Sequence, residues 1–312
     1  MANLHNLFTE FNDELKITKS KRQNLMTSKD NLRRKIREYF SKHHPNYKPK
    51  FYIQGSYKLK LIIRTKDDTC DLDDGVYFEK NPDNVSATTL QGWVKNAVEG
   101  TTDSEVEHRK KCITVDYEAG YNIDLPVLVF DSEVDDHPNL AVKNSGFQDD
   151  DPKEFVDKFN KVKSDQMVRM IKYLKSWCDY KRENMPSGLA MTVLTMDNYI
   201  GNTRDDVALK FLLIEIENIL KGNFKCVMPT TPKDDLFRNY SETRKNNFMD
   251  NLSKFIKDAK DAVDEKNKKV ASLKWKKHLG DRFPEGKDED EIIENSAHLV
   301  STIGASKPYF KL

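Results

Sequence analysis

The sequence predicts an α+β protein of two lobes, a mixed sheet with helices followed by a lobe of helices alone, with a cleft between them. Three observations support this. β-rich runs lie within residues 51–130, apolar residues recur at helical spacing from Glu154 onward, and an acidic, turn-rich stretch at 131–153 separates the two parts as a connecting loop. We therefore expect a first domain at 1–153 and a second, helical domain at 154–312.

A continuous helix is expected over residues 2–40. Its apolar residues recur three or four positions apart, which is typical of one buried helix face. They are Leu4, Leu7, Phe8, Phe11, Leu15, Leu25, Leu32, Ile36 and Phe40. Pro45 and Pro49 follow, and because proline disrupts a helix interior, the helix is expected to end before them.

Strand signals occupy residues 51–64, 71–79 and 112–130. The last segment contains two β-rich runs joined by a short connection at 118–120 that ends in glycine, which is typical of a hairpin. Apolar residues around Trp93 predict a short helix between the second and third segments.

The second half of the chain is helical in pattern. Apolar residues repeat at three- and four-residue spacing from Glu154 to Leu220, and charged amphipathic segments follow at 241–272 and 290–303. We expect these helices to complete the cleft against the sheet.

Asp71 and Asp73 form a pair of carboxylates on the second strand segment. Residues i and i+2 of a strand share a face, so both carboxylates point together while Leu72 points the other way. Two such charges repel each other unless a cation lies between them, and hard oxygen ligands favour magnesium. An isolated Asp-x-Asp is more often a solvated acidic turn, so the neighbouring motifs decide between the two interpretations.

Two neighbouring features favour a phosphate and metal site. Gln54-Gly55-Ser56 precedes the pair, and a glycine lets backbone N–H groups approach a phosphate while the serine adds a hydroxyl donor. Asp124 follows within an apolar strand, where an unpaired carboxylate is costly to bury. A metal shared with Asp71 and Asp73 would supply the missing partner.

In this order, the glycine-serine motif, the Asp71–Asp73 pair and Asp124 resemble the DNA polymerase beta-like nucleotidyltransferases. More narrowly, the chain resembles the bacterial cyclic-oligonucleotide synthases related to cyclic GMP-AMP synthase, the CD-NTases of CBASS anti-phage systems, and among these the dinucleotide cyclases. The likeness spans roughly residues 50–285. It continues through Gly146-Phe147, Asp151-Pro152, Tyr173-Leu174-Lys175-Ser176-Trp177, Pro186-Ser187 and Gly280-Asp281-Arg282-Phe283-Pro284.

The resemblance implies a polymerase beta-like lobe and a site for two Mg²⁺ ions, which Mn²⁺ could replace. Asp71 and Asp73 would hold both ions, and Asp124 would complete the ion that activates the attacking hydroxyl. Asp74 lies on the opposite strand face, so it should not be a ligand and its replacement should be mild.

The resemblance also implies a nucleotide site. Gln54, Gly55 and Ser56 would hold the triphosphate. Lys175 would bind a phosphate; the alternative interpretation is an ordinary lysine on a helix surface. Ser187 would also contact a phosphate; the alternative interpretation is that it caps the start of a helix. Asp235 would read a base, since a carboxylate accepts hydrogen bonds from the amino and imino groups of guanine.

The activity implied is the joining of ribonucleoside triphosphates, ATP and GTP first among them, into a cyclic di- or trinucleotide for anti-phage defence, with release of pyrophosphate. Two alternatives keep the same donor site: linear oligoadenylate synthesis, and nucleotidylation of RNA or protein. A non-catalytic nucleotide-binding regulator is disfavoured, because all three carboxylates are present.

Composition limits the partners. The chain has 52 basic and 51 acidic residues, whereas proteins that bind a long duplex usually carry a clear basic excess. We therefore expect no obligatory DNA or RNA activator, and regulation by a partner protein or an inhibitory small molecule.

No apolar run approaches the roughly 18 residues of a membrane span, and the four cysteines form no C-x-x-C motif. A cytoplasmic monomer is expected.

Overall fold

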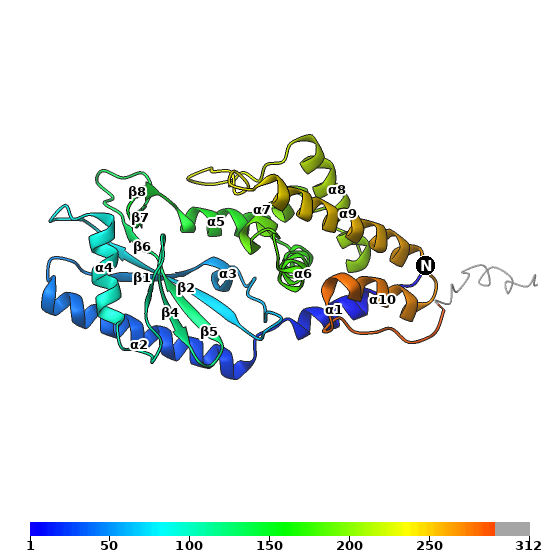
Figure 1. Cartoon of the computed structure of the whole chain (residues 1–312), viewed down its shortest axis with the longest axis horizontal. Coiled ribbons are helices and arrows are strands. Elements are labelled where there is room, and N and C mark those ends of the chain that lie inside the picture. Colours follow the sequence, from blue (N-terminus) through cyan, green and yellow to red (C-terminus); the bar gives the residue numbers. More distant parts are fainter. Residues whose placement is uncertain (291–312) are drawn as a thin grey trace, which may run out of the picture.

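The structure is a computed structural model that describes residues 1–290. Apart from its first residue, the amphipathic segment expected at 290–303 lies outside the described residues. The described part has one mixed sheet and ten helices, and the helices from α5 onward gather on one side of the sheet (Figure 1). The two-lobed α+β architecture is confirmed.

The sheet contains eight strands within residues 1–290. These are β1 (Lys50–Gln54), β2 (Cys70–Phe78), β3 (Glu107–His108), β4 (Ile113–Tyr117), β5 (Tyr121–Leu125), β6 (Val127–Val129), β7 (Asn139–Val142) and β8 (Gly146–Asp149). β2 is central: it pairs antiparallel with β1 and parallel with β5 and β6. The expected hairpin is β4–β5, with the turn at Gly120, whose φ is +75°.

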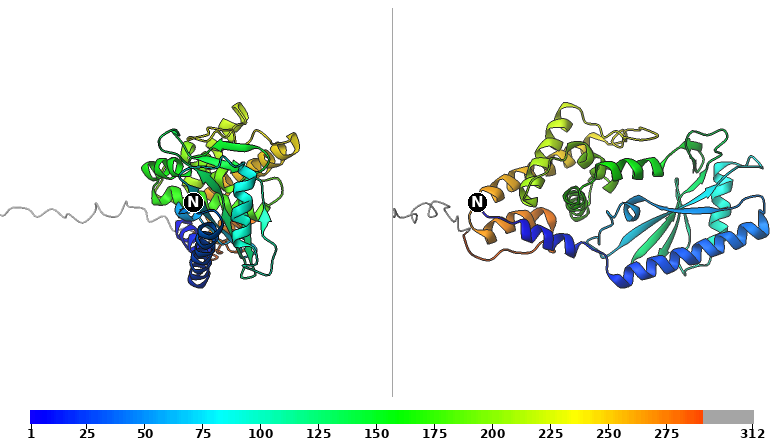
Figure 2. Two further views of the ribbon diagram at one scale, coloured as in Figure 1. Left: turned by 90° about the vertical axis from the view of Figure 1, so that its left-hand side faces the viewer. Right: turned by 180° about the vertical axis from the view of Figure 1, so that it is seen from behind.

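The helices occur in two groups. The ranges are α1 (His5–Glu14), α2 (Lys19–His43), α3 (Gly55–Lys58), α4 (Ala87–Val98), α5 (Pro152–Val162), α6 (Asp165–Lys181), α7 (Gly188–Asn198), α8 (Asp205–Gly222), α9 (Glu242–Asp264) and α10 (Lys268–Leu279). α2 and α4 cover one face of the sheet, as the view from behind also shows (Figure 2). α5 to α10 form the helical lobe, and α1 packs into the same core.

The predicted continuous helix over residues 2–40 was wrong, because α1 and α2 are separate helices. The hydroxyl of Thr18 accepts a hydrogen bond from the backbone N–H of Lys21 at 3.1 Å and caps the start of α2. The two helices also serve different cores. Phe8 packs against Trp275 in the helical lobe, whereas Phe40 packs against Phe78 of the sheet. One straight helix would not reach both.

Two further expectations need correction. The strand expected at 51–64 ends at Gln54, since Gly55 has a φ of +60° and starts the single turn of α3. The stretch at 131–153, expected as a loop, contains the antiparallel β7–β8 hairpin. The apolar residues of β7 are buried against the sheet, which outweighs the acidic, turn-rich composition around them.

No helix within residues 1–290 has the length and apolar character to cross a membrane.

Candidate active site at the sheet–helix cleft

The three predicted carboxylates share one region of the sheet. Parallel pairing of β2 with β5 places Asp73 beside Asp124, and Asp71 beside Asn122. Leu72 and Ile123 are fully buried on the opposite face, against α2 and α4. Strand alternation therefore directs the carboxylates away from these helices.

Gly55 lies directly against the Asp73 carboxylate. Gln54 pairs with Asp73 in the β1–β2 register, so the chain turns into α3 immediately above the acidic pair. A Cβ atom at residue 55 would lie 1.9 Å from Asp73 Oδ2. Glycine is therefore required here twice, for its positive φ and for this close approach.

Ser56 supplies an unused donor at the same turn. Its Oγ is buried and has no hydrogen-bond partner within residues 1–290. Buried hydroxyls are normally paired, so an orphan hydroxyl beside a glycine turn is the arrangement expected for an anion contact.

The carboxylates repel one another. Burial, together with the nearby charges of Asp71 and Asp124, raises the pKa of Asp73 to about 7, against an opposing effect of Lys175. Burial also raises the pKa of Asp124, while the Thr114 hydroxyl and the Arg109 charge act in the other direction. Lys175 and Arg109 therefore do not fully offset the burial and mutual repulsion of these carboxylates.

Lys175 reaches this cluster from α6. Its Nζ donates a hydrogen bond to the carbonyl of Leu61 at 2.9 Å. Burial lowers its pKa, and the charges of Asp71 and Asp73 oppose that shift. A Cβ at Gly188, where α7 begins, would lie 2.8 Å from Lys175 Cε, so the glycine makes room for the lysine stem.

A cleft of about 400 Å³ joins these groups. Both lobes line it: the sheet side contributes the Gln54-Gly55-Ser56 turn and the acidic pair, and the helical side contributes Lys175 and Gly188. This location between the lobes agrees with the sequence-based expectation for the cleft.

Three predicted residues do not line the cleft. Asp124 lies behind Asp73 on the neighbouring strand. Ser187 caps α7 by accepting from the backbone N–H of Ala190 at 3.2 Å, which was the alternative to phosphate contact. Asp235 Oδ1 accepts from the backbone N–H groups of Cys226 and Phe237, both at 2.9 Å. The nucleotide roles of Ser187 and Asp235 stay predictions.

The description of Asp74 needs correction. It faces away from the acidic pair, as expected, but it is fully buried and forms a two-pronged ion pair with Arg33. The Nε–Oδ2 and Nη2–Oδ1 distances are 2.7 and 2.5 Å. Asp74 is therefore a structural residue, and its replacement is not a mild control.

Sequence reasoning missed several cleft residues. Asp150 lines the cleft, and burial raises its pKa to about 6. Leu189 and Thr192 also line it from α7. Helical spacing places Thr192 one turn after Gly188 and could have found it; no motif pointed to Asp150.

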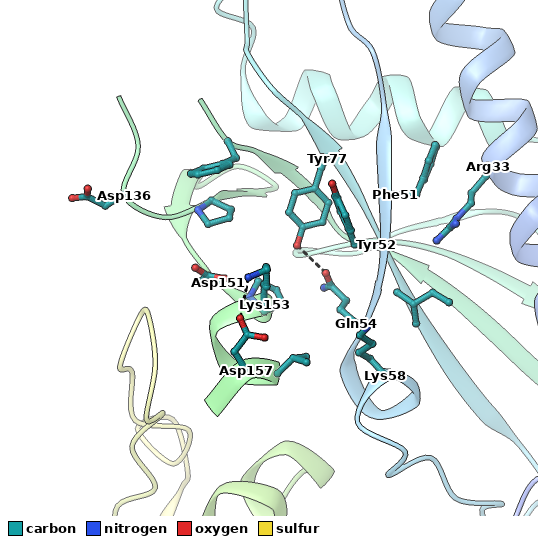
Figure 3. A pocket seen from close by; sticks show the side chains of 15 residues that line it. Arg33, Phe51, Tyr52, Gln54, Lys58, Tyr77, Asp136, Asp151, Lys153 and Asp157 are labelled. Atoms are coloured by element: carbon teal, nitrogen blue, oxygen red, sulfur yellow. Dashed lines mark hydrogen bonds and ion pairs between the residues drawn. The ribbon is translucent and has the colours of Figure 1, made fainter. Parts of the chain in front are cut away.

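A second cavity of about 780 Å³ adjoins the cleft and shares Gln54 and Asp151 with it. Tyr52 and Tyr77 lie on its wall (Figure 3). Their rings pack edge to face, with 5.1 Å between the ring centroids. The Tyr77 hydroxyl donates to Gln54 Oε1 at 3.2 Å and so connects this wall to the glycine turn.

Comparison with known proteins agrees with this geometry. Residues 49–128 match the family model of the cyclic GMP-AMP synthase DncV-like nucleotidyltransferase domain. That range contains the glycine-serine turn and all three carboxylates.

Solved structures of the Vibrio cholerae cyclic AMP-GMP synthase DncV have a similar fold. The structure in complex with nonhydrolyzable GTP has a TM-score of 0.78 at 17% identity, covering 90% of this chain and 97% of that one. The structure with the linear intermediate 5′ pppA(3′,5′)pG has a TM-score of 0.77 at 17% identity, with 90% and 96% covered. Residues 49–128 are therefore similar to the cyclic GMP-AMP synthase DncV-like nucleotidyltransferase domain, and the chain shares the fold of DncV.

Proposed function

We propose that this protein joins ribonucleoside triphosphates, ATP and GTP first among them, into a cyclic di- or trinucleotide with release of pyrophosphate. The observation that carries the proposal is the meeting of Asp71 and Asp73 with the Gly55-Ser56 turn and Lys175 in one cleft. Carboxylates for metal, donors for phosphate and a cavity between lobes are the parts that phosphoryl transfer needs.

The donor set fits divalent cations. Three carboxylates share the region, and burial together with the charges of Asp71 and Asp124 raises the pKa of Asp73 despite the opposing charge of Lys175. Oxygen ligands of this kind suit Mg²⁺ or Mn²⁺. Asp71 and Asp73 would hold two ions, with Asp124 completing one of them. When bound, such ions stabilise the charge that develops on the attacking and leaving oxygens.

The other residues would hold the donor nucleotide. The orphan hydroxyl of Ser56 and the backbone N–H groups of the turn are available to phosphate oxygens. Lys175 would exchange its bond to the Leu61 carbonyl for a phosphate contact, which neutralises more charge. Ser187 and Asp235 would contact the nucleotide only after releasing the backbone groups that they cap.

The reaction has two matching steps. A ribose hydroxyl of one nucleotide attacks the α-phosphorus of the other, a phosphodiester bond forms, and the bond to the pyrophosphate leaving group breaks. The linear intermediate then turns so that its own free hydroxyl attacks the α-phosphorus of its remaining triphosphate. A second phosphodiester bond closes the ring, and the bond to a second pyrophosphate leaving group breaks. The solved DncV complexes with nonhydrolyzable GTP and with a pppApG intermediate support ribonucleoside triphosphates as the substrate class.

The biological setting follows from the resemblance to CD-NTases. We place the enzyme in CBASS anti-phage defence, in the cytoplasm where its substrates are made, as a monomer regulated by a partner protein or an inhibitory small molecule. Linear oligoadenylate synthesis and nucleotidylation of RNA or protein remain the alternatives, because they use the same donor site.

Product analysis tests the proposal. The purified protein is incubated with the four ribonucleoside triphosphates and Mg²⁺, and the products are identified by mass spectrometry. Cyclic di- or trinucleotides and pyrophosphate are expected. Long linear chains alone, or labelled RNA or protein without a small product, would favour the alternatives. Bound but unconverted nucleotide would indicate a regulator.

A further inference from the structure

Thr114 lies directly opposite Asp124 in the β4–β5 hairpin, and Asp73 lies on the other side of Asp124 in β2. Paired residues of neighbouring strands point to the same face, so the three side chains form one row across three strands. One end of the row is a carboxylate that lines the cleft, and the other is a hydroxyl that solvent does not reach.

The hydroxyl of Thr114 contacts the carboxylate of Asp124. Thr114 Oγ1 lies 2.5 Å from Asp124 Oδ1, and Thr114 is fully buried. An ionised carboxylate only accepts hydrogen bonds, so the hydroxyl donates. Cys112 Sγ lies 3.6 Å from the same hydroxyl, and because the hydroxyl proton points to Asp124, the thiol is the donor in that contact. A directed chain of donors thus ends on one oxygen of Asp124.

This arrangement differs from that of the buried threonines on α7. Thr192 and Thr195 each donate to the backbone carbonyl four residues earlier in their own helix, which is the usual local contact. Thr114 instead donates to an acidic side chain on the adjacent strand. Bonds to a charged acceptor are stronger than neutral ones, so this bond restricts rotation of the Asp124 carboxylate. Fixing Oδ1 also fixes the direction in which Oδ2 points.

We infer that Thr114 is a positioning residue whose hydroxyl holds Asp124 in the orientation that presents it to the divalent-ion site. The inference rests on the proposed function, in which Asp124 is an ion ligand. Partners that orient metal ligands are commonly worth about ten- to a hundredfold in metal affinity. In the hairpin register the residue of β4 directly opposite Asp124 is Thr114.

Binding of Mn²⁺ to the full chain tests the inference without relying on turnover. Affinity is measured by electron paramagnetic resonance with a nonhydrolysable ribonucleoside triphosphate present. Thr114→Val keeps the shape and removes the hydroxyl, so we expect binding weakened by about ten- to a hundredfold. Thr114→Ser keeps the donor and should restore most of the affinity. Thr114→Ala serves as a second hydroxyl-free variant if the valine variant melts early.

Two controls separate positioning from packing. Thr195→Val removes an equally buried hydroxyl on α7 and should leave Mn²⁺ binding unchanged. In an Asp124→Asn background, Thr114→Val should cause no further loss, because the residue through which it acts is already altered.

The outcomes distinguish this inference from the proposed function. Mn²⁺ binding that depends on Asp124 but is unaffected by loss of the Thr114 hydroxyl would overturn the inference and leave the proposed function standing. The same holds if the serine variant binds as weakly as the valine variant. If substitution of Asp71, Asp73 or Asp124 leaves Mn²⁺ binding at the level of the unaltered chain, the proposed function fails as well.

Discussion

Gly55, which follows β1 and begins α3, lies against Asp73 of β2: a Cβ on the glycine would lie 1.9 Å from Oδ2 of the aspartate. The backbone that is proposed to bind phosphate and the carboxylate that is proposed to bind metal are therefore fitted to each other. Neither can move without displacing the other.

The first prediction follows from this contact. Gly55→Ala should lower kcat/KM by at least about a hundredfold, because the new methyl group displaces the Asp73 carboxylate and the positive φ disfavours any side chain. Gly92→Ala is the matched control: nothing lies within 4 Å of a Cβ there, and the residue sits inside α4. It should keep full activity and raise stability by up to about 1 kcal/mol. Equal activity of the two variants would contradict the proposed fit.

The second prediction concerns the acidic pair. Asp71→Ala and Asp73→Ala should each lower turnover by several orders of magnitude, because ion and electrostatic stabilisation supplies most of the rate in this chemistry. The fold should persist, since these carboxylates repel one another and removing one relieves that repulsion. Turnover and melting temperature are measured together. Full activity of Asp73→Asn would exclude Asp73 as an ion ligand.

The third prediction concerns the neighbouring residue. Asp74→Ala should destabilise the protein by about 3–5 kcal/mol, because it leaves the Arg33 guanidinium without its partner beside a fully buried site. Denaturant unfolding measures the loss. Replacing both residues by apolar ones of similar volume should recover much of the stability. A destabilisation below about 1 kcal/mol would mean that the pair contributes little.

The fourth prediction concerns pH. Asp205 is fully buried and accepts hydrogen bonds from Arg169, Gln166 and Tyr173. Although burial acts in the opposite direction, these partners hold its pKa below the ordinary 3.8. A lowered folded-state pKa means that the stabilisation is present above pH 3.8 and is lost as pH falls through the folded-state value.

Thermal unfolding of Asp205→Asn measures this contribution. Its melting temperature should lie below that of the unaltered chain at neutral pH, and the gap should narrow as pH falls below about 3.8. If the difference in melting temperature between the two proteins stays constant with pH, the destabilisation comes from altered packing and not from the lost charge.

The fifth prediction concerns activation. The purified chain should form product without added nucleic acid, because its 52 basic residues are matched by 51 acidic ones and backbone binding needs several unpaired cations acting together. Turnover is compared with and without duplex DNA and RNA at about 50 and 200 mM salt, a range over which such contacts weaken strongly. Strong, salt-sensitive stimulation would contradict the prediction.

The sequence by itself determined the features that depend on local geometry. Strand alternation put Asp71 and Asp73 on one face and Leu72 on the other, and the structure has that arrangement. The hairpin around Gly120 and the helical second half were likewise predictable, since turn chemistry and apolar spacing are properties of neighbouring residues.

Only the tertiary structure decided which distant residues meet. Nothing near Asp74 in the sequence indicates Arg33, and nothing near Leu61 indicates Lys175, yet both pairs are hydrogen-bonded. The break between α1 and α2 likewise arises because Phe8 and Phe40 are buried in different cores. The physical reason is that pairing, burial and desolvation depend on contacts between residues far apart in the chain, which local propensity does not encode.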